Sequence, residues 1–159
     1  MKIPKMKKTN TGFTLVELIV VLAIFGLGVA LTIPAFGSFL QSSRLNGQTN
    51  QISGTLRAAR RAAITKNINT VFVLDMTNHE YFYFEDPNGD GVRGVGESRS
   101  QVNEMPEGVT FQNHTFSQDR VVFGPKGTTI ESGTITIQNI HHGARSIRVF
   151  SGTGMISML

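Results

Sequence analysis

The chain has 159 residues, 40% of them apolar and 16% charged, a composition that supports one compact core and excludes a disordered chain. The formal net charge is +4, but the first twelve residues contain four lysines and the remainder is neutral. That neutrality argues against a nucleic-acid-binding domain, and the absence of cysteine excludes disulfides and thiolate metal sites.

The N-terminus joins a basic stretch to a long apolar one, with no charged residue between Glu17 and Arg44. About 20 apolar residues are enough to cross a hydrocarbon core, so we predict a membrane-spanning helix over residues 13–40. The lysines before it predict a cytoplasmic N-terminus. Residues 41–159 should then form a domain outside the cytoplasm.

Glu17 needs an explanation, because an acidic side chain inside a membrane costs about 2.5–3.5 kcal/mol on insertion scales. A segment that served only as an anchor would carry leucine at this position. An intramembrane acid is therefore a functional candidate. The alternative is a carboxylate that snorkels to the cytoplasmic surface, and the sequence leaves both open.

The stretch from Gly12 to Glu17 reads GFTLVE, and it resembles the processing site of type IV prepilins and pseudopilins. Pro34 lies in the register that the resemblance requires. The resemblance implies a leader peptide over residues 1–12, cleavage between Gly12 and Phe13 by a prepilin peptidase, and N-methylation of Phe13. An uncleaved anchor with an accidental glutamate is the alternative.

The resemblance also implies an assembly role for Glu17 and Pro34. In the family, the carboxylate pairs with the N-terminal ammonium of a neighbouring subunit, and such a pair is much stronger in a low dielectric than in water. Glu17 and the new N-terminus are also four residues apart on one helix, so pairing within one chain is within reach.

The helical pattern continues to about Asn67. Apolar positions recur at helical spacing and predict a stripe that docks onto a sheet; they are Leu45, Ile52, Leu56, Ala59 and Ala63. The arginines at 57, 60 and 61 lie off this stripe and are interpreted as a solvated face.

After Lys66 the pattern changes to the alternation of strands. Strands are predicted at 70–75, 80–85, 109–112, 120–124, 134–138, 145–150 and 154–158. One helix followed by short strands predicts an α+β fold with an antiparallel sheet. The segment 86–108 is interpreted as a surface loop.

Four motifs that follow the apolar segment are similar to those of the GspH/FimT group, which comprises minor pseudopilins of type II secretion and minor pilins of type IV pili. They lie at residues 56–63, 122–127, 133–137 and 145–149. The resemblance implies a type IV pilin-like fold in which a long N-terminal helix, membrane-spanning in its first half, packs on an antiparallel β-sheet domain.

The leading functional hypothesis is a minor pseudopilin at or near the tip of a type II secretion pseudopilus that helps export folded proteins. The resemblance implies a single-pass protein of the bacterial inner membrane, with a periplasmic C-terminal domain, that enters a periplasmic filament. Its implied partners are other minor and major pseudopilins or pilins, the prepilin peptidase and the inner-membrane assembly platform.

The alternative is a FimT-like minor pilin that assists pilus assembly or DNA uptake. For that role the resemblance assigns nucleic-acid binding to basic residues on the C-terminal strands, here Arg145 and Arg148, but the last strand carries no basic residue. We therefore expect weak or no DNA binding.

A secreted enzyme is disfavoured because no catalytic constellation is present. The four histidines are scattered, and neighbours such as His141 and His142 would face opposite sides of a strand, so a loop role is favoured over metal binding.

Residues 86–97 match the calcium-loop pattern D-x-D/N-x-D/N-G-x5-E. The candidate ligands are Asp86, Asn88, Asp90, the Val92 carbonyl and Glu97. A strand precedes this loop where a helix is expected, and Arg93 adds positive charge. A solvated Asn-Gly and Asp-Gly turn is the alternative, and no other cofactor is indicated.

Overall fold

The computed structural model describes residues 12–159, and for residues 31–36 it describes the backbone alone. The chain divides into two units, Met1–Gly37 and Ser38–Leu159, and each is described by itself. Helix α1 (Leu15–Lys66) contributes residues to both units. It ends where Asn67 adopts a left-handed backbone with φ of 55° and the Ile68 N–H donates to the Ala63 carbonyl, a common helix termination.

In the first unit, every described side chain of α1 up to Ala30 is exposed. Among the described residues, none of the helices is both long and apolar enough to cross a membrane. The predicted span, residues 13–40, includes residues 31–36, whose side chains lie outside the described part of the chain. Pro34 belongs to that segment, so its assembly role stays a prediction.

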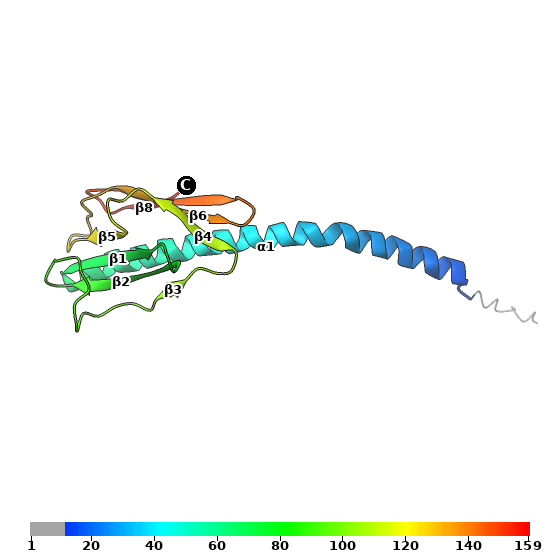
Figure 1. The fold of residues 1–159 in the computed structure, drawn as a ribbon, viewed down its shortest axis with the longest axis horizontal. Coiled ribbons are helices and arrows are strands. Elements are labelled where there is room, and N and C mark those ends of the chain that lie inside the picture. The colour runs from blue at the N-terminus through cyan, green and yellow to red at the C-terminus, as the bar shows by residue number, and fades with distance from the viewer. Residues whose placement is uncertain (1–11) are drawn as a thin grey trace, which may run out of the picture. The chain divides into compact units, whose positions relative to one another are not determined.

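The second unit contains two four-stranded antiparallel sheets (Figure 1). The first sheet has the order β3-β2-β1-β5 and comprises β1 (Asn69–Asp75), β2 (Glu80–Asp86), β3 (Asn103–Glu104) and β5 (Arg120–Phe123). The second has the order β4-β6-β7-β8 and comprises β4 (Val109–His114), β6 (Gly133–Asn139), β7 (Ala144–Val149) and β8 (Ile156–Met158).

The predicted helix and all seven predicted strands are confirmed to within two residues at each end. The structure differs in two respects. The strands divide between two sheets, whereas the sequence predicted one antiparallel sheet domain. The predicted loop 86–108 contains the additional strand β3, whose two polar residues carry no alternating pattern.

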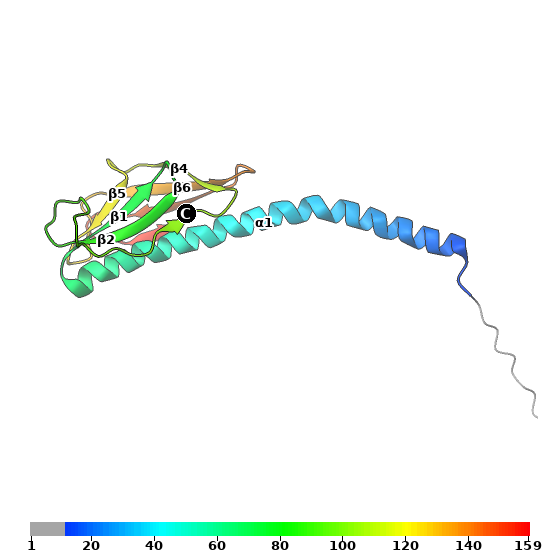
Figure 2. The same cartoon turned by 60° about the horizontal axis from the view of Figure 1, so that its bottom comes forward.

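The core of the second unit lies between α1 and the sheets. The predicted stripe is buried at 2% exposure or less in each of its members: Leu45, Ile52, Leu56, Ala59 and Ala63. It belongs to the same cluster as Phe72 and Phe123 of the first sheet and Ile135 and Ile147 of the second. Figure 2 shows β1 and β2 running along this part of α1.

One polar pair is buried within this core. The Gln48 Nε2 donates to the Tyr81 hydroxyl at 3.0 Å, so both groups are satisfied away from water. Burial raises the pKa of Tyr81 to about 12, and the hydrogen bonds from Gln48 and Thr55 offset part of this effect.

Candidate functional site

Gly12 and Phe13 stand just before α1, in exposed chain. No atom of the neighbouring structure lies within 4 Å of the position that a Cβ would take at Gly12, and Phe13 is 80% exposed. The peptide bond between them is therefore open to a peptidase. The rest of the predicted leader, residues 1–11, lies outside the described residues.

Thr14 caps the helix that follows. Its Oγ1 accepts the Glu17 N–H at 3.2 Å, and its carbonyl accepts the Leu18 N–H at 3.2 Å. Thr14 and Glu17 thus have the Thr-x-x-Glu spacing of a capping box. The sequence analysis missed this local role, although the letters TLVE display it.

Capping does not by itself explain Glu17. A carboxylate in the first turn gains about 0.3–1 kcal/mol from the helix dipole, less than the 2.5–3.5 kcal/mol that an acid costs inside a membrane on insertion scales. Within the described part of the chain, Glu17 forms no ion pair. The helix dipole therefore does not offset the cost of this charge, which is consistent with a counter-charge outside this chain.

The helix surface after Glu17 is a second part of the site. Large apolar side chains expose between 39% and 69% of their surface along this stretch: Leu18, Ile19, Val20, Val21, Leu22, Ile24, Phe25, Leu27 and Val29. Burying one such side chain is worth about 1.5–3 kcal/mol. A continuous apolar surface of this kind needs cover from lipid or from neighbouring helices.

Arg60 joins three separate parts of the second unit. Its Nε donates to the Gly127 carbonyl at 2.8 Å, and its Nη2 donates to the Thr153 carbonyl at 3.1 Å. Gly154 has φ of 59°, and a Cβ there would lie 2.1 Å from the Gly127 oxygen. The motifs at 56–63 and 122–127 therefore meet at one arginine, which gives the resemblance a structural basis.

The two arginines of the DNA-uptake alternative point in different directions. Arg145 Nε donates to Asn46 Oδ1 of α1 at 3.0 Å, whereas the Arg148 guanidinium lies over the Phe150 ring at 5.8 Å from its centroid. Residues three apart on a strand face opposite sides of a sheet. The pair does not form one basic patch, and its role in nucleic-acid binding stays a prediction.

Hydrogen bonds from backbone N–H groups of the loop to its own side chains stabilise the predicted calcium loop. Asp86 is buried and accepts the N–H groups of Gly89 at 2.8 Å and Gly91 at 3.0 Å. Asp90 Oδ1 accepts the Val92 N–H at 2.7 Å. The Asn88 amide contributes further bonds within the loop, donating to Asp90 and accepting its N–H.

Two more contacts close this loop. Glu97 accepts the Gly94 N–H at 2.7 Å, and the Arg120 guanidinium donates to the Gly91 carbonyl. Among the described residues, no group of three or more His, Asp or Glu side chains is placed to hold a metal ion. Calcium binding therefore stays a prediction, and the hydrogen bonds favour the alternative of an ordinary turn.

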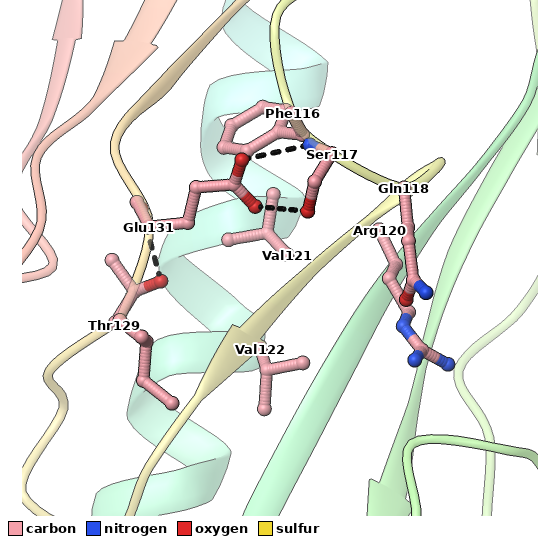
Figure 3. A pocket seen from close by; sticks show the side chains of 9 residues that line it. Phe116, Ser117, Gln118, Arg120, Val121, Val122, Thr129 and Glu131 are labelled. Carbon is pink, nitrogen blue, oxygen red and sulfur yellow. Dashed lines mark hydrogen bonds between the residues drawn. The ribbon is translucent and has the colours of Figure 1, made fainter.

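A cavity of about 160 Å³ opens beside β5 (Figure 3). Glu131 lies on one side of it and Arg120 on the other. Both carboxylate oxygens of Glu131 are used, one by the Ser117 N–H at 2.7 Å and one by the Ser117 hydroxyl at 2.9 Å. This carboxylate is thus occupied as an anchor for the loop.

The histidines are dispersed, as the sequence indicated. His114 Nε2 contacts Asp119 Oδ1 at 2.7 Å, and His79 has a left-handed backbone in the turn between β1 and β2. His141 and His142 lie in the turn between β6 and β7, which confirms their loop position.

Two family descriptions match the chain. "Type II transport protein GspH" matches residues 48–153, and the "Prokaryotic N-terminal methylation motif" matches residues 7–33. The second match contains the predicted cleavage site and Glu17.

Curated relatives are pilins. A "Fimbrial protein" of Pseudomonas aeruginosa is 28% identical over 102 residues, which are 64% of this chain and 64% of that protein. The "Type IV major alpha-pilin" of Moraxella bovis is 41% identical over 51 residues, 32% of this chain and 30% of that protein. The chain thus spans less than two thirds of the curated relatives that it matches.

Solved structures share the fold. The minor pseudopilin EpsH from the Type 2 Secretion System of Vibrio cholerae aligns with a TM-score of 0.57 at 9% identity, covering 73% of this chain and 96% of EpsH. The type IV minor pilin FimU of Pseudomonas aeruginosa aligns with a TM-score of 0.59 at 15% identity, covering 76% of this chain and 92% of FimU.

The fold is therefore the α+β pilin fold, with a long N-terminal helix packed on antiparallel sheets. The GspH match spans well over half of the 159 residues. The chain belongs to the GspH family of type II transport proteins, and it carries the N-terminal methylation motif.

Proposed function

We propose that this pseudopilin is a low-copy subunit at or near the tip of the pseudopilus and helps export folded proteins across the outer membrane. Its methylation motif is that of a precursor anchored in the inner membrane and assembled into a periplasmic filament. The observation that carries the proposal is the register of Gly12, Phe13 and Glu17 at the start of a helix whose apolar side chains are exposed.

Cleavage before Phe13 creates an α-ammonium four residues ahead of Glu17. In the filament, we infer, the Glu17 carboxylate pairs with the ammonium of a neighbouring subunit. The apolar side chains of the two helices then cover one another, which lowers the local dielectric and strengthens the pair. The partners are other pseudopilins, with the prepilin peptidase and the inner-membrane assembly platform acting earlier.

The replacement Glu17→Leu tests this role. Removal of an intramembrane charge should leave membrane insertion intact or improve it, whereas loss of the neighbour's counter-charge should reduce incorporation into filaments. Membrane fractionation measures the first effect and filament pull-down the second. Val16→Leu, a change on the same helical turn that keeps the carboxylate, is the matched control. Wild-type incorporation of Glu17→Leu would show that Glu17 only snorkels.

Processing is tested separately by mass spectrometry of membrane-extracted protein. The mature chain should begin with a methylated Phe13 and keep its apolar segment. Replacement of Gly12 by a bulky residue should leave the leader attached, because the peptidase needs a small residue before the cut. Ala35 and Gly37 loosely fit the small-x-small cleavage rule of a signal peptidase. A mature terminus after either residue would contradict the pseudopilin proposal.

A type IV pilus is the second candidate, favoured by the likeness to FimU and to the fimbrial proteins. In that case the gene neighbours would encode pilus components and not a secretion ATPase with an outer-membrane secretin. Submicromolar, salt-sensitive binding of duplex DNA that is lost on replacing Arg145 and Arg148 would support the uptake role. We expect no such binding.

A further inference from the structure

The loop after β2 contains two chemically reactive dipeptides. The chain has two Asn-Gly sequences and one Asp-Gly sequence, and two of these three follow one another as Asn88-Gly89 and Asp90-Gly91. In such pairs the backbone nitrogen of the glycine can attack the side-chain carbonyl carbon of the residue before it, because glycine has no Cβ to hinder the approach. All four residues are exposed or half-buried, so water reaches them.

The attack closes a succinimide ring. At Asn88 a bond forms between the Gly89 nitrogen and Cγ, the bond from Cγ to Nδ2 breaks, and ammonia leaves with the proton of the Gly89 nitrogen. The Asp90 carboxyl group, in its protonated form, reacts with the Gly91 nitrogen in the same way and releases water. Water then opens either carbonyl of the ring. The product is an aspartyl residue or an isoaspartyl residue, whose backbone runs through the side-chain carbons.

Asp86 occupies the N–H groups of both glycines. Its side chain is buried at 1% exposure, its Oδ1 accepts the Gly89 N–H at 2.8 Å, and its Oδ2 accepts the Gly91 N–H at 3.0 Å. Each reaction requires the glycine nitrogen to give up this proton and to direct its lone pair at Cγ. A carboxylate in contact with the N–H opposes both steps, because it repels the developing negative charge on the nitrogen and fixes the direction of the N–H.

Other features of the loop keep this arrangement in place. Gly89 and Gly91 have φ of 74° and 70°, a left-handed backbone that glycine adopts without strain. The Arg120 guanidinium donates to the Gly91 carbonyl and ties the loop to β5. Pro87 follows Asp86 and has no backbone N–H, so Asp86 itself cannot react by this route.

We propose that Asn88 and Asp90 form a site of spontaneous deamidation and isomerisation, and that the Asp86 carboxylate keeps this site unreactive in the folded domain. Each of the two carboxylate oxygens protects one peptide unit. The inference goes beyond the proposed function, because it depends on contacts within residues 86–91 and not on assembly into a filament.

The modification would change a surface as well as a loop. Gly91 and Val92 line an open hollow of about 590 Å³ on the first sheet, together with Phe82 and Phe84. Deamidation of Asn88 adds a negative charge to the same loop. An isoaspartyl residue would displace the backbone that forms one wall of the hollow.

The second Asn-Gly sequence, Asn46-Gly47, is an internal control. It lies within α1, where the Gly47 N–H belongs to the hydrogen-bond ladder of the helix. The Asn46 Oδ1 accepts the Arg145 Nε at 3.0 Å. A change that acts only through Asp86 should leave Asn46 unreactive, whereas general unfolding of the domain should release it.

The test follows both reactions in the full-length protein, kept in detergent at mildly alkaline pH. Mass spectrometry of peptides detects deamidation at Asn88 by the change from amide to acid, and an isoaspartyl methyltransferase labels the isoaspartyl products. Asp86→Ala should accelerate modification at Asn88 and Asp90 roughly 10- to 100-fold, the factor that corresponds to loss of one hydrogen bond to a charged group.

Two further variants separate protection from stability. Asp75→Ala removes a carboxylate that accepts the N–H groups of Thr77 and Asn78 in the turn between β1 and β2, so it is the matched control and should leave both rates unchanged. Asp86→Asn keeps the size of the side chain but offers a single acceptor oxygen. It should therefore release one glycine N–H and accelerate one position more than the other.

Other outcomes would overturn the inference. Unchanged rates in Asp86→Ala would show that its hydrogen bonds do not protect the loop, and slower modification would make Asp86 a base that assists the attack. Equal acceleration at Asn46, or the same acceleration in Asp75→Ala, would mean that Asp86 acts only through the stability of the domain. If Asp86→Ala does not fold, wild-type rates at both positions in Asp86→Asn would overturn the inference as well.

Discussion

The two parts of α1 differ in how their apolar side chains are buried. Between Leu15 and Ala30 every side chain is exposed, whereas between Leu45 and Ala63 an apolar stripe is buried at 2% exposure or less. The later part obtains its packing partners from the same chain, from both sheets. The described apolar side chains of the earlier part are exposed and belong to no such cluster. One part of the helix thus packs within the domain, whereas the other is the part that the proposed function assigns to association.

This comparison is tested most strongly by equivalent changes in the two parts. Leu56→Ala removes a fully buried side chain and should lower the free energy of unfolding by about 2–5 kcal/mol. Leu22→Ala, at a position 61% exposed, should leave that quantity unchanged. Thermal unfolding of the full-length protein in detergent measures both. Equal destabilisation by the two changes would mean that the first part also packs within the chain.

Arg60 connects the buried part of α1 to two loops. Arg60→Lys keeps the charge but cannot reproduce the two-pronged contact with the Gly127 and Thr153 carbonyls. Loss of one hydrogen bond from a charged group should cost about 1.5–3 kcal/mol of unfolding free energy. Denaturant unfolding measures it, with Arg61→Lys as the matched control on the same turn. No difference between the two variants would assign Arg60 to the solvated face.

A smaller effect depends on pH. Burial raises the pKa of Tyr81 to about 12, above the ordinary value of 10.0. Between these values the unfolded chain has released the proton while the folded chain keeps it, so stability falls as pH rises. The slope should approach about 1.4 kcal/mol per pH unit. Tyr81→Phe removes this contribution, so the stability difference between wild type and Tyr81→Phe should change with pH above 10. A constant difference up to pH 12 would contradict the burial argument.

Much of the fold could be predicted from the sequence, because its signals are local. The stripe from Leu45 to Ala63 repeats at helical spacing, and the strands alternate or carry β-branched residues. The division into two sheets has no such signal. Whether a strand joins one sheet or the other depends on pairing partners far away in the chain, as with β5, which pairs with β1.

The candidate site likewise contains residues that a local motif indicates and one residue whose role depends on distant contacts. Gly12, Phe13 and Glu17 form a motif of six consecutive residues and could be found by reading. Arg60 contacts carbonyls 67 and 93 residues away, so its role could not be distinguished from that of Arg57 or Arg61. Its motif was visible, but the reason for the motif was a contact in three dimensions.

The smallest effect is expected at the loop over residues 86–97, where local pattern and folded geometry point in different directions. The pattern predicts calcium, but Asp86 and Asp90 already accept backbone N–H groups and Arg120 places a positive group on the Gly91 carbonyl. We therefore expect millimolar calcium to leave the melting temperature and the calorimetric baseline unchanged. Asp90→Ala should lower stability by about 0.5–1.5 kcal/mol with or without calcium, because the Val92 N–H loses its acceptor. A rise in melting temperature with calcium that disappears in Asp90→Ala would instead establish the metal site, and it would mean that the loop exchanges its internal hydrogen bonds for the ion.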